Sequence, residues 1–192
     1  MSRSNLLVLL AIASGALAQT WSACNPRTKS SCPADAALGT TLNETWTAAS
    51  TQLSPQLWNV SAGGQWINFT DKGAEMTISK SGQSVTVESL FYIFWGRVEV
   101  IMQAAAGQGI ISTFDLLSDD LDEIDLEIMG GNTSYVESNW YGWGNTSQYN
   151  ALYHPVSGPQ ESMHNYTIIW NENETQWIFV GDTGLQITVN FG

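Results

Sequence analysis

The chain has 192 residues with six basic and eighteen acidic side chains, which give a formal net charge of −12 at pH 7. Nucleic acids and anionic membranes would repel so acidic a protein, whereas neutral polymers such as polysaccharides carry no such penalty. The length suits a single domain with a sizeable core. We therefore expect no nucleic-acid partner, and the charge leaves neutral polymers open.

Residues 1–18 are predicted to be a secretory signal peptide. Arg3 supplies a positive start, Leu6–Ala13 is a short apolar core, and Ala16–Leu17–Ala18 is a small-residue cleavage site. The apolar run is too short to span a bilayer. We expect a secreted, extracellular protein without a membrane span, whose domain covers residues 19–192.

The two cysteines, Cys24 and Cys32, lie close to the predicted mature start, where a disulfide is expected after secretion. One short loop cannot be the scaffold of the fold, so we expect it to pin the amino-terminal segment. Asn-x-Ser/Thr sequons are dense and fit a glycosylated extracellular protein. They lie at Asn43, Asn59, Asn68, Asn132, Asn145, Asn165 and Asn173.

Short strands are predicted along the remaining chain. Met76 and Ile78 alternate with polar residues, as do Val85 and Val87, and Gly82 marks a turn between them. Aromatic and β-branched segments follow, bounded by Gly, Asn or Pro. They cover residues 91–102, 110–114, 123–128, 139–143, 166–170 and 177–180. No stretch of 15 residues keeps a helical period, which predicts an all-β sandwich or jelly roll.

The most unusual stretch is acidic, because seven of the eighteen acidic residues fall between Asp115 and Glu127. On a strand, one face would carry three carboxylates and the other three aliphatic side chains. The first set is Glu123, Asp125 and Glu127, and the second is Ile124, Leu126 and Ile128. The spacing of Leu117, Leu121, Ile124 and Ile128 also fits a helix. The surrounding β pattern and Gly130–Gly131 favour the strand.

Paired carboxylates suggest a retaining glycosidase, which holds its two carboxyl groups about 5–5.5 Å apart. On a straight strand the Cα atoms of Glu123 and Glu127 would lie roughly 13 Å apart, so this hypothesis requires a bent strand. Asp125 and Glu123 would raise the proton affinity of Glu127. A calcium site and a merely solvated acidic face remain alternatives.

The segment Asp122–Glu127 contains E-I-D-L-E and resembles the E-I-D-x-E signature of glycoside hydrolase family 16. Phe91–Val100 and Ser118–Asp125 closely resemble the fungal Crh-type cell-wall transglycosylases of that family. The similarity runs roughly from Cys24 to Gly181 and includes Tyr153–Val156 and His164–Thr167. It implies a concanavalin-like β-jelly-roll sandwich of two antiparallel sheets, with the signature strand lining a glycan groove.

By this resemblance Glu123 is the nucleophile, Asp125 the helper and Glu127 the acid/base. Family members cleave a chitin or β-glucan donor and transfer it to a glucan or chitin acceptor, which cross-links the cell wall. The alternatives are a plain β-glucanase or chitinase, and a lectin-like binding module without turnover. We expect no cofactor, no metal and a monomer.

Aromatic side chains are the expected sugar platforms, since the C–H faces of sugars pack on rings while hydroxyls find polar partners. Core packing is the alternative for each of them. The candidates are Asn139, Trp140, Tyr141, Trp143, His164 and Trp177. His154 and His164 lack a third ligand pattern, so they do not indicate zinc.

The chain departs from the resemblance at a few positions that bear on donor and acceptor preference. Leu126 and Ile128 stand where an aromatic residue is usual, and Trp143 replaces a Lys. Asn150–Ala151 replaces Asp-Arg, and Val180 replaces an Asp. Domains of this family continue further than Gly192, so we expect residues 19–192 to form only part of the catalytic domain, incomplete at the carboxyl end.

Overall fold

The computed structural model describes residues 22–180 and 186–191, so the predicted signal peptide lies outside the described residues. The regular elements of this part are strands and one short 3-10 helix, Gly64–Trp66. The strands are β1 Trp58–Ala62, β2 Ile67–Thr70, β3 Gly73–Met76, β4 Thr86–Ser89, β5 Gly96–Met102, β6 Ile111–Leu117, β7 Glu123–Met129, β8 Tyr135–Tyr141, β9 Leu152–Pro155, β10 His164–Trp170, β11 Thr175–Val180 and β12 Gln186–Phe191. Within the described ranges, no helix is long and apolar enough to cross a membrane.

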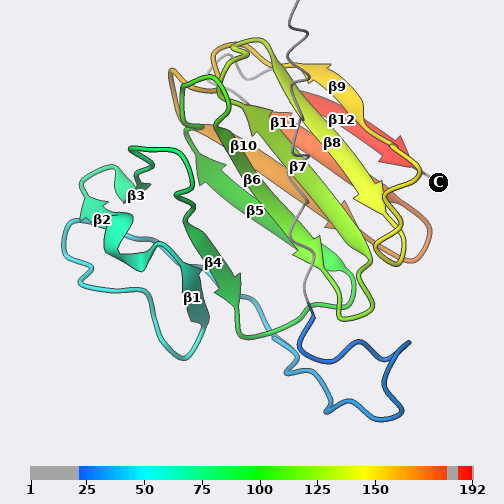
Figure 1. The fold of residues 1–192 in the computed structure, drawn as a ribbon. Coiled ribbons are helices and arrows are strands. Elements are labelled where there is room, and N and C mark those ends of the chain that lie inside the picture. The colour runs from blue at the N-terminus through cyan, green and yellow to red at the C-terminus, as the bar shows by residue number, and fades with distance from the viewer. Residues whose placement is uncertain (1–21, 181–185, 192) are drawn as a thin grey trace, which may run out of the picture.

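Two four-stranded antiparallel sheets form the body of the molecule (Figure 1). One has the strand order β6-β7-β8-β9, and the other has the order β12-β11-β10-β5. The pairs β1-β4 and β2-β3 form two smaller sheets beside this sandwich (Figure 1). The predicted all-β sandwich of antiparallel sheets is confirmed.

The core lies between the two large sheets and takes side chains from both. Leu126 and Ile128 on β7 are fully buried against aromatic residues of β10 and β11, which include Tyr166 and Phe179. Alternate residues of a strand point to opposite faces of its sheet. Since Leu126 and Ile128 face the core, Glu123, Asp125 and Glu127 point to the outer face, away from the second sheet. The predicted alternation in β7 is therefore confirmed, and the helical alternative is wrong.

The start of β7 explains why the helical spacing is not used. Leu121 has a φ of 69°, in the left-handed region that an α-helix of L-residues does not enter. Its N–H donates to the carbonyl oxygen of Ser118 at 3.0 Å, which closes a turn directly before the strand. The side chain of Ser118 accepts the N–H of Asp122 at 2.9 Å. This turn separates β6 from β7.

Two predicted strands have different limits in the structure. The expected strand over residues 91–102 begins only at Gly96, because Trp95 has a φ of 63° and interrupts the extended backbone. The expected strand over 139–143 is β8, which starts earlier and ends at Tyr141. Gly82 does form a turn with a φ of 82°, but β3 pairs with β2, and β4 pairs with β1.

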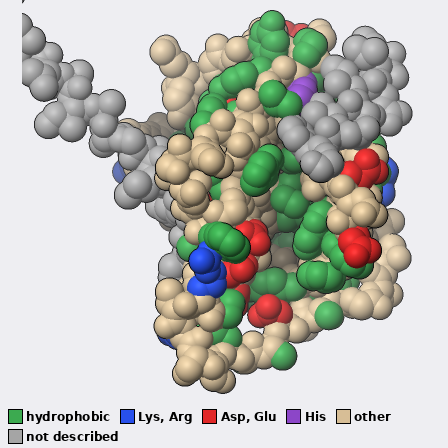
Figure 2. Space-filling model, turned by 90° about the vertical axis from the view of Figure 1, so that its right-hand side faces the viewer, with side chains coloured by type: hydrophobic (Ala, Val, Ile, Leu, Met, Phe, Trp, Pro, Cys, Tyr) green, Lys and Arg blue, Asp and Glu red, His purple; other side chains and the backbone are tan. Residues whose placement is uncertain are grey.

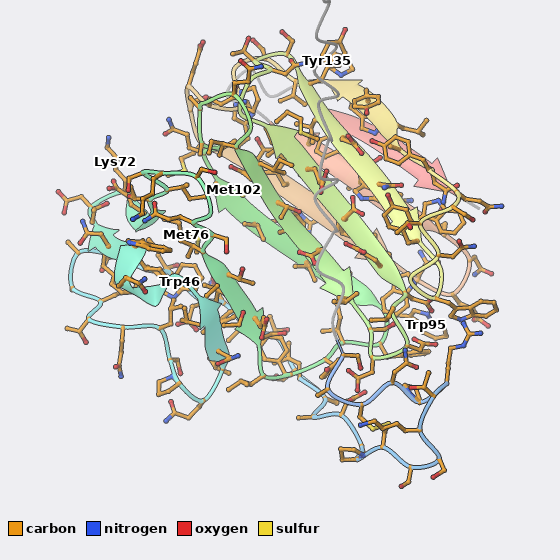
Figure 3. All side chains as sticks on the ribbon, in the orientation of Figure 1. Trp46, Lys72, Met76, Trp95, Met102 and Tyr135 are labelled. Atoms are coloured by element: carbon orange, nitrogen blue, oxygen red, sulfur yellow. A yellow bond between two sulfur atoms is a disulfide. The ribbon has the colours of Figure 1, made fainter. Side chains whose placement is uncertain are left out.

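The disulfide between Cys24 and Cys32 is present, as predicted, and closes a loop at the amino-terminal end (Figure 3). Arg27 in this loop lies over the ring of Trp143, with its guanidinium carbon 4.0 Å from the ring centroid. Figure 3 also shows Tyr135 and Trp95 at opposite ends of the sandwich. All sequon asparagines are exposed except Asn165, which is half-buried in β10.

Candidate active site

The outer face of the β6-β7-β8-β9 sheet gathers acidic and polar side chains from three neighbouring strands. Residues directly opposite one another in a sheet point to the same face, with Cβ atoms about 4.5–5.5 Å apart. The strand register therefore defines three rows across β6, β7 and β8. They are Asp115 with Asp125 and Asn139, Thr113 with Glu127 and Glu137, and Leu117 with Glu123 and Tyr141.

Burial distinguishes the central carboxylate from its neighbours. Asp125 is 4% exposed, whereas Glu123 and Glu127 are half-buried and so remain partly accessible. Several buried oxygen atoms of this face have no hydrogen-bond partner among the described residues. They are Glu123 Oε2, Asp125 Oδ1, Glu137 Oε2 and Asn139 Oδ1. Unpaired buried acceptors are costly, so this face is suited to hold protons or donor groups of a ligand.

The carboxyl groups of β7 hold protons more strongly than isolated acids do. Burial, followed by repulsion from Asp115 and Glu127, raises the pKa of Glu123 to about 7. Burial and then repulsion, first from Glu123 and Glu127, raises the pKa of Asp125 to about 8. The groups titrate together, so near neutral pH the cluster carries both protonated and ionised carboxyls.

The pKa of Glu127 is also raised, first by burial and then by the charges of Glu137 and Asp115. The predicted repulsion among Glu123, Asp125 and Glu127 is present, since Glu127 contributes to the raised pKa of both Glu123 and Asp125. Glu137 has its strong effect because a cross-strand partner lies closer than a residue two positions away on the same strand.

Acids just before β7 have structural partners. Asp119 accepts a hydrogen bond from the hydroxyl of Tyr92 at 3.1 Å, and Asp120 accepts one from Ser118 at 2.7 Å. Asp122 accepts the backbone N–H of Trp143 at 2.8 Å. The Gly144 N–H donates to the Leu121 carbonyl oxygen at 2.6 Å, which ties the loop after β8 to the start of β7.

Only some of the predicted glycan-binding residues lie with the carboxylates. Asn139 and Tyr141 occupy the same face, opposite Asp125 and Glu123. Trp143 lies in the adjoining loop and is 63% exposed, with Arg27 over its ring. These three positions therefore border the acidic face.

The other three predicted glycan-binding residues lie elsewhere. Trp140 pairs with Ile124 and so points to the opposite side of the sheet. His164 is 3% exposed on β10, where its Nε2 lies 3.3 Å from both Ser162 Oγ and the Gly158 carbonyl oxygen. Trp177 is 1% exposed in the core. Buried side chains of the second sheet cannot stack on a sugar, so the structure assigns His164 and Trp177 to packing.

The structure adds polar residues that sequence analysis did not propose for this face. Glu137 is 3% exposed opposite Glu127, and the Tyr149 hydroxyl donates to its Oε1 at 2.5 Å. The alternation of Glu137, Asn139 and Tyr141 could have indicated a shared face. The partnership with Glu127 depends on strand register, which no local pattern specifies.

The charge of the surface agrees with the composition. Figure 2 shows acidic side chains in several places on the side of the molecule it presents, whereas basic side chains are few there. One basic partner near this face is Arg27 of the disulfide loop, held over Trp143. An anionic polymer would meet repulsion along this surface, and a neutral one would not.

Residues 55–189 match the family described as Glycosyl hydrolases family 16. The chain is 46% identical over 179 residues to Crh-like protein 2 of Botryotinia fuckeliana, covering 90% of this chain and 39% of that protein. It is 45% identical over 185 residues to Crh-like protein 3 of Aspergillus fumigatus, covering 95% of this chain and 49% of that protein. The chain thus spans less than half the length of these two curated relatives.

A solved structure described as Crh5 transglycosylase in complex with NAG is also similar. The two structures superpose with a TM-score of 0.75 at 39% sequence identity, covering 86% of this chain and 66% of the other. This similarity agrees with the jelly-roll sandwich expected from the E-I-D-L-E segment.

Proposed function

The chain belongs to the glycosyl hydrolases family 16, and from this premise we propose that it is a cell-wall glycan transglycosylase. The function consists of cleaving a chitin or β-glucan donor with retention and transferring the cleaved part to a glucan or chitin acceptor. The observation that carries this proposal is the row of Glu123, Asp125 and Glu127 on one face of β7, with proton affinities raised by burial and mutual repulsion.

The proposed chemistry has two steps. The carboxylate of Glu123 attacks the anomeric carbon, while Glu127 gives its proton to the departing glycosidic oxygen. This forms a glycosyl ester on Glu123 and releases the shortened donor. An acceptor hydroxyl then attacks the same carbon, its proton passes to Glu127, and the ester bond to Glu123 breaks. Atoms and charge balance, since Glu127 ends protonated and Glu123 ends ionised.

Asp125 is the proposed helper because it lies between these two residues and is the more deeply buried. Burial and neighbouring charges raise the pKa of both groups, of Glu123 to about 7 and of Asp125 to about 8, and the proposed helper role has Asp125 hold a proton when Glu123 acts as the nucleophile. A protonated Asp125 adds no charge next to the nucleophile and provides a hydrogen-bond donor to it. The deeper burial of Asp125 gives the nucleophile and helper different environments on one strand.

The glycan is proposed to contact Asn139, Tyr141 and Trp143, which border the carboxylates. The protein is also proposed to be secreted through residues 1–18 and N-glycosylated at exposed sequons. Its proposed location is the cell wall. The disulfide of Cys24 and Cys32 supports an oxidising compartment. The protein is proposed to act as a monomer on polysaccharide chains.

A transfer assay tests the function. Chitin oligosaccharides serve as donors and a fluorescent β-glucan oligosaccharide as acceptor, and products are separated by size. Labelled products longer than the acceptor support transfer, whereas shortened donors without such products would indicate a plain hydrolase. Glycan binding without any change in chain length would indicate a lectin-like module.

The matched variant is Glu123→Gln, which keeps the shape of the side chain and removes the nucleophile. Transfer should fall by about 10³-fold or more, because removal of a covalent nucleophile disables the first step. Glu172→Gln, an exposed acid in the turn between β10 and β11, is the control and should keep full activity. Retained transfer by Glu123→Gln would contradict the assignment.

A further inference from the structure

A fourth carboxyl group, Glu137 on β8, is buried directly beside the proposed acid/base. Glu137 is 3% exposed and stands opposite Glu127 in the strand register. Cβ atoms in such pairs are about 4.5–5.5 Å apart, so the two side chains leave the sheet side by side on the same face. Among the described residues, Arg97 and Glu99 of β5 form an ion pair. This pair does not involve Glu137 and does not neutralise its charge. Two ionised carboxylates in this position would repel each other strongly.

The two oxygens of Glu137 have different environments. Oε1 accepts a hydrogen bond from the Tyr149 hydroxyl at 2.5 Å, and this hydroxyl lies 3.0 Å from that of Tyr153. Tyr153 is the register partner of Glu137 on β9, so both tyrosines flank it. Oε2 is buried without a hydrogen-bond partner among the described residues. One side of the carboxyl is thus held in place, and the other is left unpaired.

The Tyr149 hydroxyl donates to Oε1 and so holds the Glu137 carboxyl in place on the face it shares with Glu127. Tyr149 remains a donor throughout the neutral range, because partial loss of water around its hydroxyl and then the bond to Glu137 raise its pKa. When two adjacent carboxyls share one proton, the group with the better hydrogen-bond support stays ionised and its neighbour keeps the proton. Here the supported group is Glu137 and the neighbour is Glu127.

We propose that Glu137, held by Tyr149, is a positioning residue that keeps the shared proton on Glu127. The proposal rests on the acid/base role of Glu127 in the proposed function. Glu137 does not touch the reacting bond and acts through Glu127. A general acid must carry a proton at the working pH. A glutamate with the ordinary pKa of about 4.3 is protonated in only about one molecule in 500 at pH 7, so Glu127 needs a neighbour that raises its proton affinity.

Other titratable groups also face Glu127. They are Asp115 on β6, Glu123 and Asp125 on β7, Tyr153 on β9 and Tyr149 in the loop after β8. Burial contributes most to the raised pKa of Glu127, followed by the charge of Glu137 and then that of Asp115. Of the two acids on the neighbouring strands, Glu137 on β8 therefore has a larger effect on the proton of Glu127 than Asp115 on β6.

Glu137→Gln tests the proposal, because it keeps the size and an oxygen acceptor for Tyr149 but removes the charge. The alkaline limb of the kcat/KM profile should move to lower pH. Transfer at pH 7 should fall roughly tenfold, while transfer at pH 5 changes by less than about twofold. A structural role alone would lower activity equally at both pH values. Glu172→Gln should leave the limb in place.

Tyr149→Phe provides a second variant with an opposite expectation. Tyr149 is 62% exposed, so its ring contributes little to the core. Without the hydroxyl, Glu137 competes for the proton, so the maximum rate should fall and the alkaline limb should move to higher pH. An alkaline limb that stays fixed in both variants would overturn the proposal.

A readout independent of turnover is the titration of Glu127 by NMR with ¹³C-labelled glutamate carboxyl groups. The resonance is assigned by its loss in Glu127→Gln. Its midpoint should be lower in Glu137→Gln than in the unaltered protein, and an unchanged midpoint would refute the coupling. A shifted midpoint in a protein without transferase or hydrolase activity would instead leave the coupling standing and reject the proposed function.

Discussion

The indole N–H of Trp177 on β11 donates a hydrogen bond to the backbone carbonyl oxygen of Asp125 on β7 at 2.9 Å. The two residues belong to different sheets, and Trp177 is 1% exposed between them. The bond therefore joins the core directly to the strand that carries the carboxylates. A residue predicted to hold glycan instead supports the backbone beneath the site.

Trp177→Phe should destabilise the protein, because it removes the donor to Asp125 and leaves a cavity in the core. The expected loss is about 2–4 kcal/mol in the free energy of unfolding, measured by denaturant titration. Trp46→Phe, in a half-buried position outside the large sheets, is the control with a smaller effect. If glycan affinity fell while stability stayed constant, Trp177 would be a binding residue after all.

Stability should depend on pH in the direction opposite to that of salt-bridged acids. Burial and repulsion raise the pKa of Glu123 to about 7 and of Asp125 to about 8, above ordinary values of 4.5 and 3.8. At pH values between the ordinary pKa and the raised pKa of each group, the folded state binds more protons than the unfolded state. The free energy of unfolding therefore decreases as pH rises. The melting temperature should be higher at pH 5 than at pH 8.

Asp125→Asn gives the matched comparison for this pH dependence. The amide does not ionise, so the decline of the melting temperature between pH 5 and pH 8 should become shallower. Glu172→Gln should reproduce the unaltered curve. A slope that is the same in Asp125→Asn and in the unaltered protein would show that Asp125 is not a source of the effect.

Arg27→Ala tests whether the disulfide loop helps to order the loop that carries Trp143. The lost contact is worth about 0.5–1 kcal/mol at an exposed site, so the melting temperature should change little. KM for the oligosaccharide should rise while kcat is nearly unchanged, since Trp143 lies outside the row of carboxylates. Lys29→Ala, on the same disulfide loop, is the control. Equal changes in KM for both variants would point to a general charge effect.

Much of the sandwich was predictable because its signals are local. Alternation with a period of two placed Glu123, Asp125 and Glu127 on one face, and that face is the outer one in β7. The same alternation in β8 places the side chains of Trp140 and Tyr141 on opposite faces, although both were predicted to bind glycan. The signature segment also indicated the correct family, since residues 55–189 match it.

The strand limits were less predictable, because they depend on single backbone conformations. Trp95, Leu121 and Trp143 all have positive φ values, which sequence patterns do not anticipate for bulky residues. Trp95 shortens β5, and Leu121 ends the segment before β7. Tertiary contacts, such as the bond from the Trp143 N–H to Asp122, help to hold these conformations.

By itself the sequence determined the acidic face of β7, the disulfide, the strand-rich fold and the family. Only the tertiary structure decided that Glu137 and Tyr149 accompany Glu127, and that Trp177 supports Asp125 from the core. The physical reason is that the side-chain period of a strand is a property of consecutive residues. Register and sheet packing instead join residues far apart in the chain, and a shift of one residue would exchange every partner.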